Sequence, residues 1–191
     1  MSFPSFETER LYLREITEQD AEDFYHVMSL DEVTHYYGMD SLSSKGQAEQ
    51  IIASFKSTYA RQIGMRWAII LKESQTFIGT IGYNNLSQWN KRSEVGYELH
   101  PHYWNKGYTS EALNTLIEYA FDGLGLFRLA AVTFPENAAS VHLLINQGFK
   151  KEGVLRGYIF QNNQSHDALL FSLLRPEWQK ERSLQWTISQ N

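Results

Sequence analysis

The part of the sequence with the clearest chemical content runs from residue 93 to residue 111 and reads SEVGYELHPHYWNKGYTSE. This order of residues predicts a short strand, a bend, a small loop that contains Gly107, and the first turn of a helix. Backbone N–H groups at a helix N-terminus lack intrahelical partners, and together with the helix dipole they attract an anion. Gly107 would allow the loop backbone to approach such a ligand closely. The segment therefore predicts a phosphate-binding loop, with an ordinary helix start as the alternative.

Two common nucleotide-binding motifs do not fit this loop. A P-loop requires GxxxxGK followed by Ser or Thr, and a dinucleotide-binding fold requires GxGxxG. The chain has Lys106-Gly107-Tyr108-Thr109-Ser110, with no second glycine at either spacing. Both nucleotide-binding motifs are therefore excluded.

Two acidic side chains precede the loop on the predicted strand of residues 93–99. Because side chains alternate between the two faces of a strand, Glu94 and Glu98 lie on the same face. A carboxylate held beside a reacting group can accept its proton as a general base. The same glutamates could instead be solvated residues of an exposed strand, and both interpretations stay open.

The loop resembles the acetyl-CoA loop of the GNAT superfamily of N-acetyltransferases. The resemblance is strongest to the branch of ribosomal-protein alanine acetyltransferases, whose consensus is roughly EIGYWL-PEYWGKGYATEA. The matching residues are Glu94, Val95, Gly96, Tyr97, Leu99, Pro101, Tyr103, Trp104, Lys106, Gly107, Tyr108 and Glu111. Two positions differ, because Asn105 replaces a glycine of the branch and Thr109 replaces a glycine or alanine of the wider family.

Two further motifs extend the resemblance to about residues 7–178. The first is Asn137-x-x-Ser140 followed by Gly148-Phe149. The second, at residues 167–178, is close to the branch pattern D-x-x-x-Y-S-L-L-x-x-E-W. The three motifs together are specific, whereas each alone is not.

The resemblance implies where acetyl-CoA would bind. In the family it lies between the fourth and fifth strands, which separate at a bulge, here expected near residues 97–100. Leu99 would pair with the pantetheine arm and offer an N–H toward the thioester oxygen, while Asn137 and Ser140, which also fit a plain helix N-cap, would contact the coenzyme. The pyrophosphate would lie against the loop formed by Trp104, Asn105, Lys106, Gly107, Tyr108, Thr109 and Ser110.

The implied activity is transfer of the acetyl group of acetyl-CoA to a primary amine, either a peptide or protein N-terminus or a small amine, by direct attack in a ternary complex. Glu94 matches the base of the histone-acetylating members and is the favoured base. Glu98 replaces a tryptophan of the branch, which suggests a second base or a contact for a cationic substrate. Leu144 and Phe171 stand where relatives have tyrosines, so no general acid is assigned. That absence supports the alternative, a catalytically weak acyl-CoA-binding or sensor module.

Four aromatic residues are candidates for the acceptor site. The resemblance places Tyr36 and Tyr37 beside the acceptor, although they could equally form a packed cluster at the domain edge. Tyr83 and Trp89 follow the third strand on the same side. They would line the amine pocket or simply cover the sheet.

The elements needed to position these residues follow from the hydrophobic periodicity. Strands are predicted at residues 9–16, 67–72, 77–86, 93–99, 128–134, 149–158 and 167–174, and helices at residues 17–30, 44–62, 107–121 and 137–148. This order predicts an α+β fold with a mixed, mostly antiparallel seven-stranded sheet, flanked by helices and splayed between its fourth and fifth strands. Residues 1–178 would form a single domain, and residues 179–191 a C-terminal tail.

Composition narrows the possible partners. The 191 residues include no cysteine, which suits a cytoplasmic protein, and the net charge of −5 argues against nucleic-acid binding. No signal peptide or membrane-spanning segment is expected. His100 and His102 lack a third ligand at a suitable spacing, so no metal is expected. The oligomeric state stays open, with a homodimer as one possibility.

Overall fold

An eight-stranded open sheet runs through the protein in the order β1-β2-β3-β4-β5-β6-β8-β7. This computed structural model describes residues 2–189, with the backbone alone for residues 181 and 184–189. Neighbouring strands are antiparallel except β5 and β6, which are parallel. The strands are β1 (Phe6–Glu7), β2 (Leu11–Glu15), β3 (Met65–Leu71), β4 (Thr76–Ser87), β5 (Arg92–Leu99), β6 (Arg128–Thr133), β7 (Lys150–Gln161) and β8 (Gln164–Leu174).

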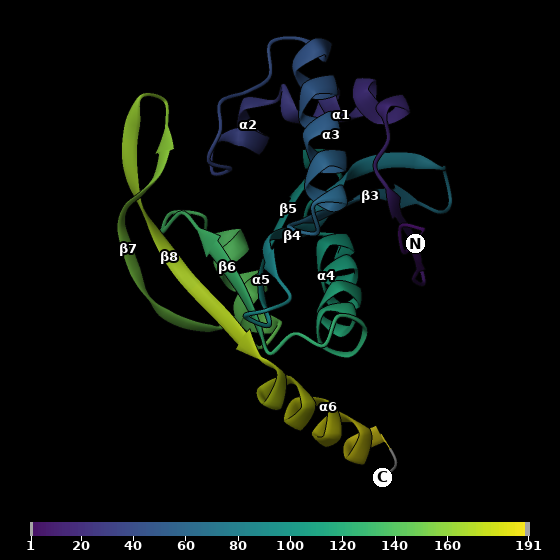
Figure 1. Cartoon of the computed structure of the whole chain (residues 1–191), viewed down its shortest axis with the longest axis vertical. Coiled ribbons are helices and arrows are strands. Elements are labelled where there is room, and N and C mark those ends of the chain that lie inside the picture. Colours follow the sequence, from purple (N-terminus) through teal and green to yellow (C-terminus); the bar gives the residue numbers. More distant parts are fainter. Residues whose placement is uncertain (1, 190–191) are drawn as a thin grey trace.

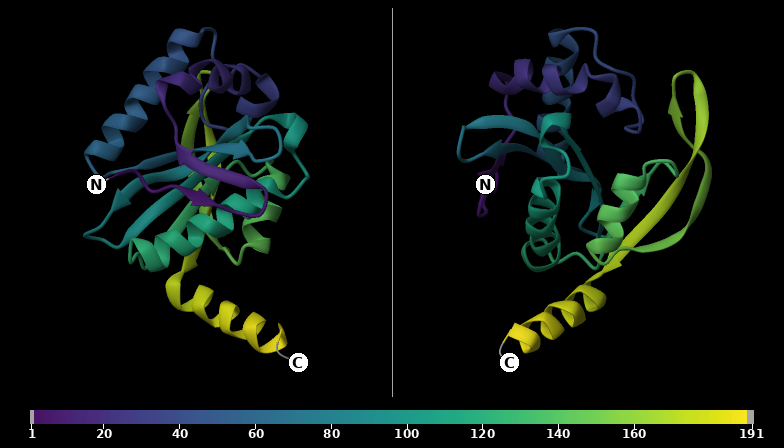
Figure 2. Two further views of the ribbon diagram at one scale, coloured as in Figure 1. Left: turned by 90° about the vertical axis from the view of Figure 1, so that its right-hand side faces the viewer. Right: turned by 180° about the vertical axis from the view of Figure 1, so that it is seen from behind.

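Helices cover both faces of the sheet (Figures 1 and 2). The α-helices are α1 (Ala21–Met28), α2 (Asp31–Thr34), α3 (Lys45–Ala60), α4 (Tyr108–Glu118), α5 (Ala138–Asn146) and α6 (Arg175–Ser189). The sheet therefore has a hydrophobic core on each face. Neighbouring residues of β3 point into different cores: Trp67 lies in the core beneath α4, and Ala68 lies in the core beneath α1 and α3. The predicted α+β fold is confirmed.

Local sequence signals explain where the first helices start. The backbone N–H of Thr17 donates to the Asp20 carboxylate (2.8 Å), as a capping box requires. Ser44 is the N-cap of α3, and the backbone N–H of Ser43 donates to the side chain of Gln47 (2.7 Å). Both helix starts predicted from sequence are therefore confirmed.

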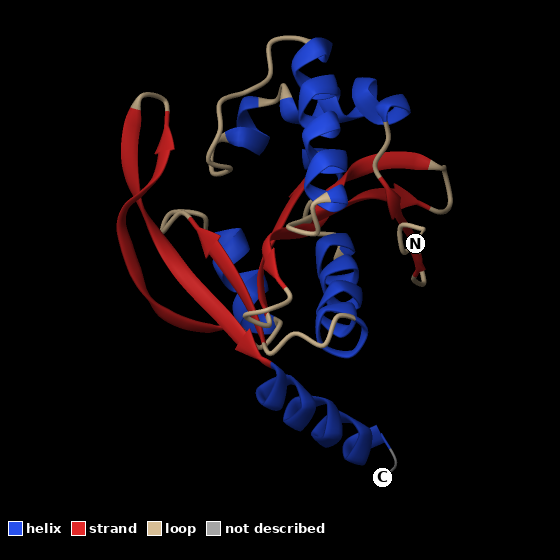
Figure 3. Cartoon of the chain, viewed as in Figure 1, coloured by secondary structure: helices blue, strands red, loops and turns tan. Residues whose placement is uncertain are grey.

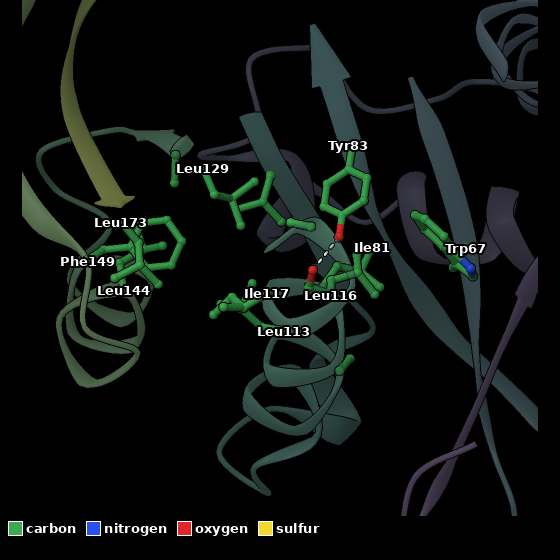
Figure 4. Close-up of a cluster of buried hydrophobic side chains, with 14 of the residues drawn as sticks. Trp67, Ile81, Tyr83, Leu113, Leu116, Ile117, Leu129, Leu144, Phe149 and Leu173 are labelled. Atoms are coloured by element: carbon green, nitrogen blue, oxygen red, sulfur yellow. Dashed lines mark hydrogen bonds between the residues drawn. The ribbon is translucent and has the colours of Figure 1, made fainter. Parts of the chain in front are cut away.

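The larger core lies between the sheet and α4. Figure 4 shows Trp67, Ile81 and Tyr83 on the sheet facing Leu113 and Leu116 of α4, all of them buried. The Tyr83 hydroxyl donates a hydrogen bond to the carbonyl oxygen of Leu116. This packing fixes α4, and with it the loop that precedes α4, against the centre of the sheet.

The central parallel pair is very short. β5 and β6 pair only through Arg92↔Arg128, Ser93↔Leu129 and Glu94↔Ala130, and then separate. Figure 3 shows the two strands diverging between α4 and α5. The predicted separation of these two strands is confirmed, although they are the fifth and sixth in the structure.

The bulge predicted near residues 97–100 is wrong. The register of β5 on β4 is continuous from Gly79↔Leu99 to Asn84↔Glu94, and the register shift lies beyond Asn84. The strands separate without an inserted residue because β5 stays paired with β4 while β6 stays paired with β8 as far as Thr133.

Two further features concern the edges of the fold. The eighth strand is β1, whose two residues are too few to give a periodic signal. The predicted boundary after residue 178 falls inside α6, where Trp178 packs against Phe121 with 5.3 Å between ring centroids. Residues 190 and 191 of the predicted tail lie outside the described part. Across residues 2–189, no helix combines the length and hydropathy needed to cross a membrane.

A long hairpin of β7 and β8 forms the other edge and reaches toward α2 (Figure 1). Gln161, near its tip, accepts from the backbone N–H of Gly38 (3.0 Å) and donates to the carbonyl oxygen of Thr34 (2.8 Å). The hairpin is thus tied to the connection between α2 and α3.

Candidate active site

A cavity of about 430 Å³ opens where β5 and β6 separate. The predicted site residues that line it are Tyr36, Tyr37, Glu94, Asn137 and Ser140. Phe24, Ile51 and Phe55 of α1 and α3 form an apolar wall on one side, and Ile159 of β7 contributes to another. The cavity therefore connects the α1–α3 layer to the N-terminus of α5.

Glu94 lies on the cavity wall at the last residue pair of the β5–β6 ladder. Its side chain is half-buried, and within residues 2–189 its carboxylate makes no hydrogen bond or ion pair. The pKa of Arg128 is raised mainly by its hydrogen bonds to Glu152, and the negative charge of Glu94 adds to that shift. A carboxylate with free lone pairs beside a cavity can accept a proton from a bound ligand.

Glu98 has a different environment, although it lies on the same face of β5. Its side chain is 2% exposed and accepts hydrogen bonds from the hydroxyls of Tyr37 (2.8 Å) and Thr80, with Arg66 Nη1 at 3.5 Å from Oε2. Burial raises the pKa of the Glu98 carboxyl, and the Arg66 guanidinium opposes that shift. Glu98 does not line the cavity. These contacts favour Glu94 over Glu98 as the base.

Two residues of the predicted phosphate-binding loop have unusual backbone conformations. Asn105 and Gly107 both adopt left-handed conformations, with φ of 59° and 81°. Asn tolerates this region better than most residues, which explains how Asn105 can replace the glycine of the branch. Gly107 is the N-cap of α4, so the free N–H groups of the first turn follow it directly.

Arg10, the residue that precedes β2, contacts this loop with its side chain. Its guanidinium donates to the carbonyl oxygen of Lys106 (2.9 Å), pairs with Glu111 (2.7 Å) and lies 4.5 Å from the ring centre of Tyr108. Lys106 itself is exposed, with its ammonium 5.6 Å from the ring centre of Tyr103. Residues 104–110 do not line the cavity; residues 104–107 are exposed, and residues 108–110 are half-buried.

Leu99 directs its backbone N–H toward the separated strands. His100 donates its N–H to the carbonyl oxygen of Ile78 on β4 (2.8 Å), and successive residues of a strand direct their N–H groups to opposite sides. The Leu99 N–H therefore points away from β4. The Leu99 carbonyl oxygen accepts a hydrogen bond from the Trp104 indole (2.7 Å), which links the strand end to the loop.

Asn137 and Ser140 form the N-terminus of α5. The Asn137 side chain accepts from the backbone N–H of Ser140 (3.1 Å), so its predicted role as an N-cap is confirmed. The Ser140 hydroxyl shares a hydrogen bond with the hydroxyl of Tyr97 (2.7 Å). Burial raises the pKa of Tyr97 to about 12, so this hydroxyl is protonated at neutral pH.

The aromatic candidates divide into two groups. Tyr36 and Tyr37 line the cavity, as the acceptor-site interpretation requires. Tyr83 is 1% exposed and packs in the core, which favours the covering role that was its alternative. Trp89 is 93% exposed on the turn after β4 and does not line the cavity.

Among the cavity residues that were not identified as site residues from the sequence, those with polar side chains are Arg66, Asn84, Tyr97 and Thr133. Tyr97 matches the loop consensus, but a consensus position alone does not reveal a hydroxyl in a cavity. The sequence contains one indication of the role of Arg66, which is a charged residue within the apolar strand β3. A charge in such a strand needs a buried partner.

The described residues contain no group of three or more His, Cys, Asp or Glu side chains that could hold a metal ion. His100 and His102 flank a single 3₁₀ turn, in which the backbone N–H of His102 donates to His100 Nδ1 (3.2 Å). They therefore form a local turn.

Comparisons with known proteins agree with this geometry. The family model described as acetyltransferase (GNAT) domain matches residues 10–150. The "Uncharacterized N-acetyltransferase YoaA" of Bacillus subtilis (strain 168) is 44% identical over 91% of this chain and 98% of its own length. The ribosomal protein uS5-alanine N-acetyltransferase of Escherichia coli (strain K12) is 29% identical over 56% of this chain and 55% of its own.

The fold is also that of a solved acetyltransferase. The crystal structure of the microcin C7 self-immunity acetyltransferase MccE in complex with acetyl-CoA and AMP superposes with a TM-score of 0.77. The two chains are 21% identical, and the superposition covers 87% of this chain and 93% of the chain in that crystal structure. The family match over most of the chain and the near full-length similarity to YoaA together show that the chain belongs to the GNAT family of acetyltransferases.

Proposed function

We propose that this N-acetyltransferase moves the acetyl group of acetyl-CoA to a primary amine by direct attack in a ternary complex, with Glu94 as the base. The observation that carries the proposal is one continuous cavity that is lined by residues of both separated strands, β5 and β6. It brings Glu94 and the α1–α3 side into one space with Asn137 and Ser140 of α5. An acceptor and the acyl donor could therefore enter from different sides and meet near Glu94.

The reaction requires an unprotonated amine. An aliphatic amine is mainly protonated at neutral pH, so the Glu94 carboxylate would take one proton from it. The nitrogen then attacks the thioester carbonyl carbon, forming the C–N bond as the C–S bond breaks. The second proton that the nitrogen must lose to become an amide passes to water, and the departing thiolate takes its proton from water. The Leu99 N–H, which points away from β4, would stabilise charge on the carbonyl oxygen, a kind of contact worth about 3–4 kcal/mol in other acyl-transfer enzymes.

Two helix N-termini, those of α4 and α5, support the proposed binding of acetyl-CoA. The helix N-terminus after Gly107 would hold the pyrophosphate, and Asn137 with Ser140 would contact the pantetheine region. A side chain at position 107 would lie 3.3 Å from Arg10 Nη2, so the loop has little room for one. The acceptor would be a peptide or protein N-terminus or a small amine. The similarity to an enzyme named for alanine of ribosomal protein uS5 favours the first class.

The test measures CoA release from acetyl-CoA in the presence of a panel of primary amines. The variant Glu94→Gln should lower kcat/KM by roughly 10²–10⁴-fold, while acetyl-CoA still raises the melting temperature. Glu49→Gln is the matched control, because Glu49 is an exposed glutamate of α3 and its loss should leave the rate unchanged.

Two outcomes would contradict the proposal. An unchanged rate in Glu94→Gln would remove Glu94 as the base. Stabilisation by acetyl-CoA without turnover of any amine would instead favour the acyl-CoA-binding or sensor module. Leu144 and Phe171 are buried apolar residues at positions where relatives have tyrosines, so neither can act as a general acid. This observation supports the second function.

A further inference from the structure

Arg10 connects the β2–β3 side of the sheet to the loop that precedes α4. Its carbonyl oxygen accepts a hydrogen bond from the backbone N–H of Lys72 (2.9 Å), which continues the pairing of β2 with β3. Its side chain extends to the loop, where Nη1 donates to the carbonyl oxygen of Lys106 (2.9 Å). A single residue therefore fixes one peptide group of the loop relative to the sheet.

Glu111, in the first turn of α4, holds the Arg10 side chain in this orientation. Its carboxylate accepts hydrogen bonds from Arg10 Nε (2.7 Å), from the backbone N–H of Arg10 (2.8 Å) and from the hydroxyl of Thr8 (2.5 Å). The guanidinium also lies 4.5 Å from the ring centre of Tyr108. Because Nε and Nη1 belong to one rigid plane, the contact of Nε with Glu111 directs Nη1 to Lys106.

The contact with Lys106 sets the direction of the next backbone N–H group. The peptide bonds of the described residues are trans, and in a planar trans peptide the N–H points opposite to the C=O. The N–H of Gly107 therefore points away from Arg10. Within residues 2–189, this N–H and those of Tyr108 and Thr109 make no hydrogen bond. Because glycine permits many backbone conformations, this peptide group would otherwise be free to turn its carbonyl oxygen toward an anion.

The charges beside the loop separate orientation from simple attraction. The Arg10 guanidinium and the Glu111 carboxylate neutralise each other, and an ion pair whose side chains are 41% and 17% exposed contributes little to stability. A carboxylate in the first turn of α4 would by itself repel a diphosphate. Loss of Glu111 should therefore strengthen anion binding if charge alone matters, and weaken it if Glu111 is needed to hold Arg10. The two explanations predict changes of opposite sign.

We infer that Arg10 is a positioning residue for acetyl-CoA: it directs the N–H of Gly107 toward the diphosphate, and Glu111 holds Arg10 in place. The inference rests on the proposed function, and it adds to the coenzyme site two residues that act through the loop. Arg10 lies 96 positions before Lys106 in the sequence, so no local motif reveals this role.

Calorimetric titration with acetyl-CoA tests the predicted sign. Glu111→Ala should raise the dissociation constant by about tenfold, as expected for the loss of hydrogen bonds between charged groups, and Arg10→Gln should raise it by a similar factor. The double variant should bind no more weakly than either single variant, because the two residues act as one unit. Unchanged or tighter binding by Glu111→Ala, or additive losses in the double variant, would overturn the inference.

Two control variants match these changes in charge. Glu118→Ala removes an exposed glutamate from the other end of α4. Arg14→Gln breaks the ion pair of Arg14 with Asp20 (2.6 Å), in which the Arg14 side chain is 42% exposed, close to the value for Arg10. Both controls should leave the dissociation constant of acetyl-CoA unchanged. Binding weakened by the same factor in either control would overturn the inference, since the loss of any surface charge would then have this effect.

A shortened acetyl donor distinguishes an effect on the loop from a general loss of structure. S-acetylpantetheine lacks the nucleotide and its diphosphate. In Arg10→Gln, kcat/KM for acetyl-CoA should fall by about tenfold, whereas kcat/KM for S-acetylpantetheine and the KM for the amine should stay as they are in the unmodified protein. Equal losses with both donors would overturn the inference.

A further measurement needs neither a variant nor turnover. The ¹⁵N–¹H signal of the Gly107 backbone amide, followed in the unmodified protein, should shift on addition of acetyl-CoA and stay in place on addition of S-acetylpantetheine. An unmoved signal while acetyl-CoA binds would overturn the inference and leave acetyl transfer with Glu94 as the base standing. Failure of the proposed function would show separately, as an acetyl-CoA titration of the unmodified protein without any binding, and that result would overturn the inference as well.

Discussion

Replacing Gly107 with alanine tests the loop most directly, because the change adds one carbon atom at a left-handed position. Gly107 has φ of 81°, where an L-residue costs about 1–2 kcal/mol relative to glycine. The new Cβ would also lie 3.3 Å from Arg10 Nη2. Arg10 is 41% exposed, so its ion pair with Glu111 contributes little stability and the backbone strain dominates the loss.

The expected result is a lower melting temperature and weaker binding of acetyl-CoA. For a chain of this size, each 1 kcal/mol corresponds to about 2–4 °C, so Gly107→Ala should melt about 2–8 °C lower. Gly125→Ala is the matched control, because Gly125 has φ of 63° and no heavy atom within 4 Å of an added Cβ. It should lose a similar amount of stability without affecting the loop.

Calorimetric titration with acetyl-CoA then separates the two effects. Gly107→Ala should raise the dissociation constant, since the carbon and the displaced Arg10 alter the backbone that faces the pyrophosphate. Gly125→Ala should leave it unchanged. If both variants bind acetyl-CoA as the unmodified protein does, the loop is not the pyrophosphate site. If Gly107→Ala melts at the original temperature, the strain argument itself is wrong.

Two further predictions concern acid stability and the acceptor side. The Arg128 guanidinium and the Ser172 hydroxyl lower the pKa of Glu152 from 4.5 to about 2, so this carboxylate stabilises the fold above pH 4.5 and loses that effect as the pH falls toward 2. Melting temperatures of Glu152→Gln should therefore fall less steeply over this range than those of the unmodified protein, and equal slopes would refute the assignment. Trp89→Ala should change neither the melting temperature nor the KM for the amine, because Trp89 is 93% exposed outside the cavity. If Trp89→Ala raised the KM for the amine, Trp89 would instead be part of the acceptor site.

The features that could be predicted from the sequence are those that a short segment determines alone. The loop, the capping box at Thr17 and the N-cap at Asn137 each depend on a few neighbouring residues, and all have the predicted local backbone. The separation of the two central strands was expected from the family resemblance. Its cause could not be predicted, since it depends on which strands β5 and β6 pair with on their other sides.

The features that could not be predicted depend on contacts between distant segments. Alternation placed Glu94 and Glu98 on one face of a strand, but it could not show that Arg66, Tyr37 and Thr80 would enclose only Glu98. The burial of Tyr83 beneath α4 could not be predicted for the same reason. The alternation of side chains along a strand shows which residues share a face of the sheet, but it does not show which helices cover that face.

The tie between Gln161 and the α2–α3 connection has a consequence for how acceptor preference can evolve. Ile159, two residues before Gln161, contributes to the cavity, so one wall of the proposed amine pocket would belong to a hairpin at the margin of the sheet. The proposed pyrophosphate contacts belong to a different stretch of chain. Substitutions near the hairpin tip can therefore reshape the pocket for new amines while the acyl donor is held as before.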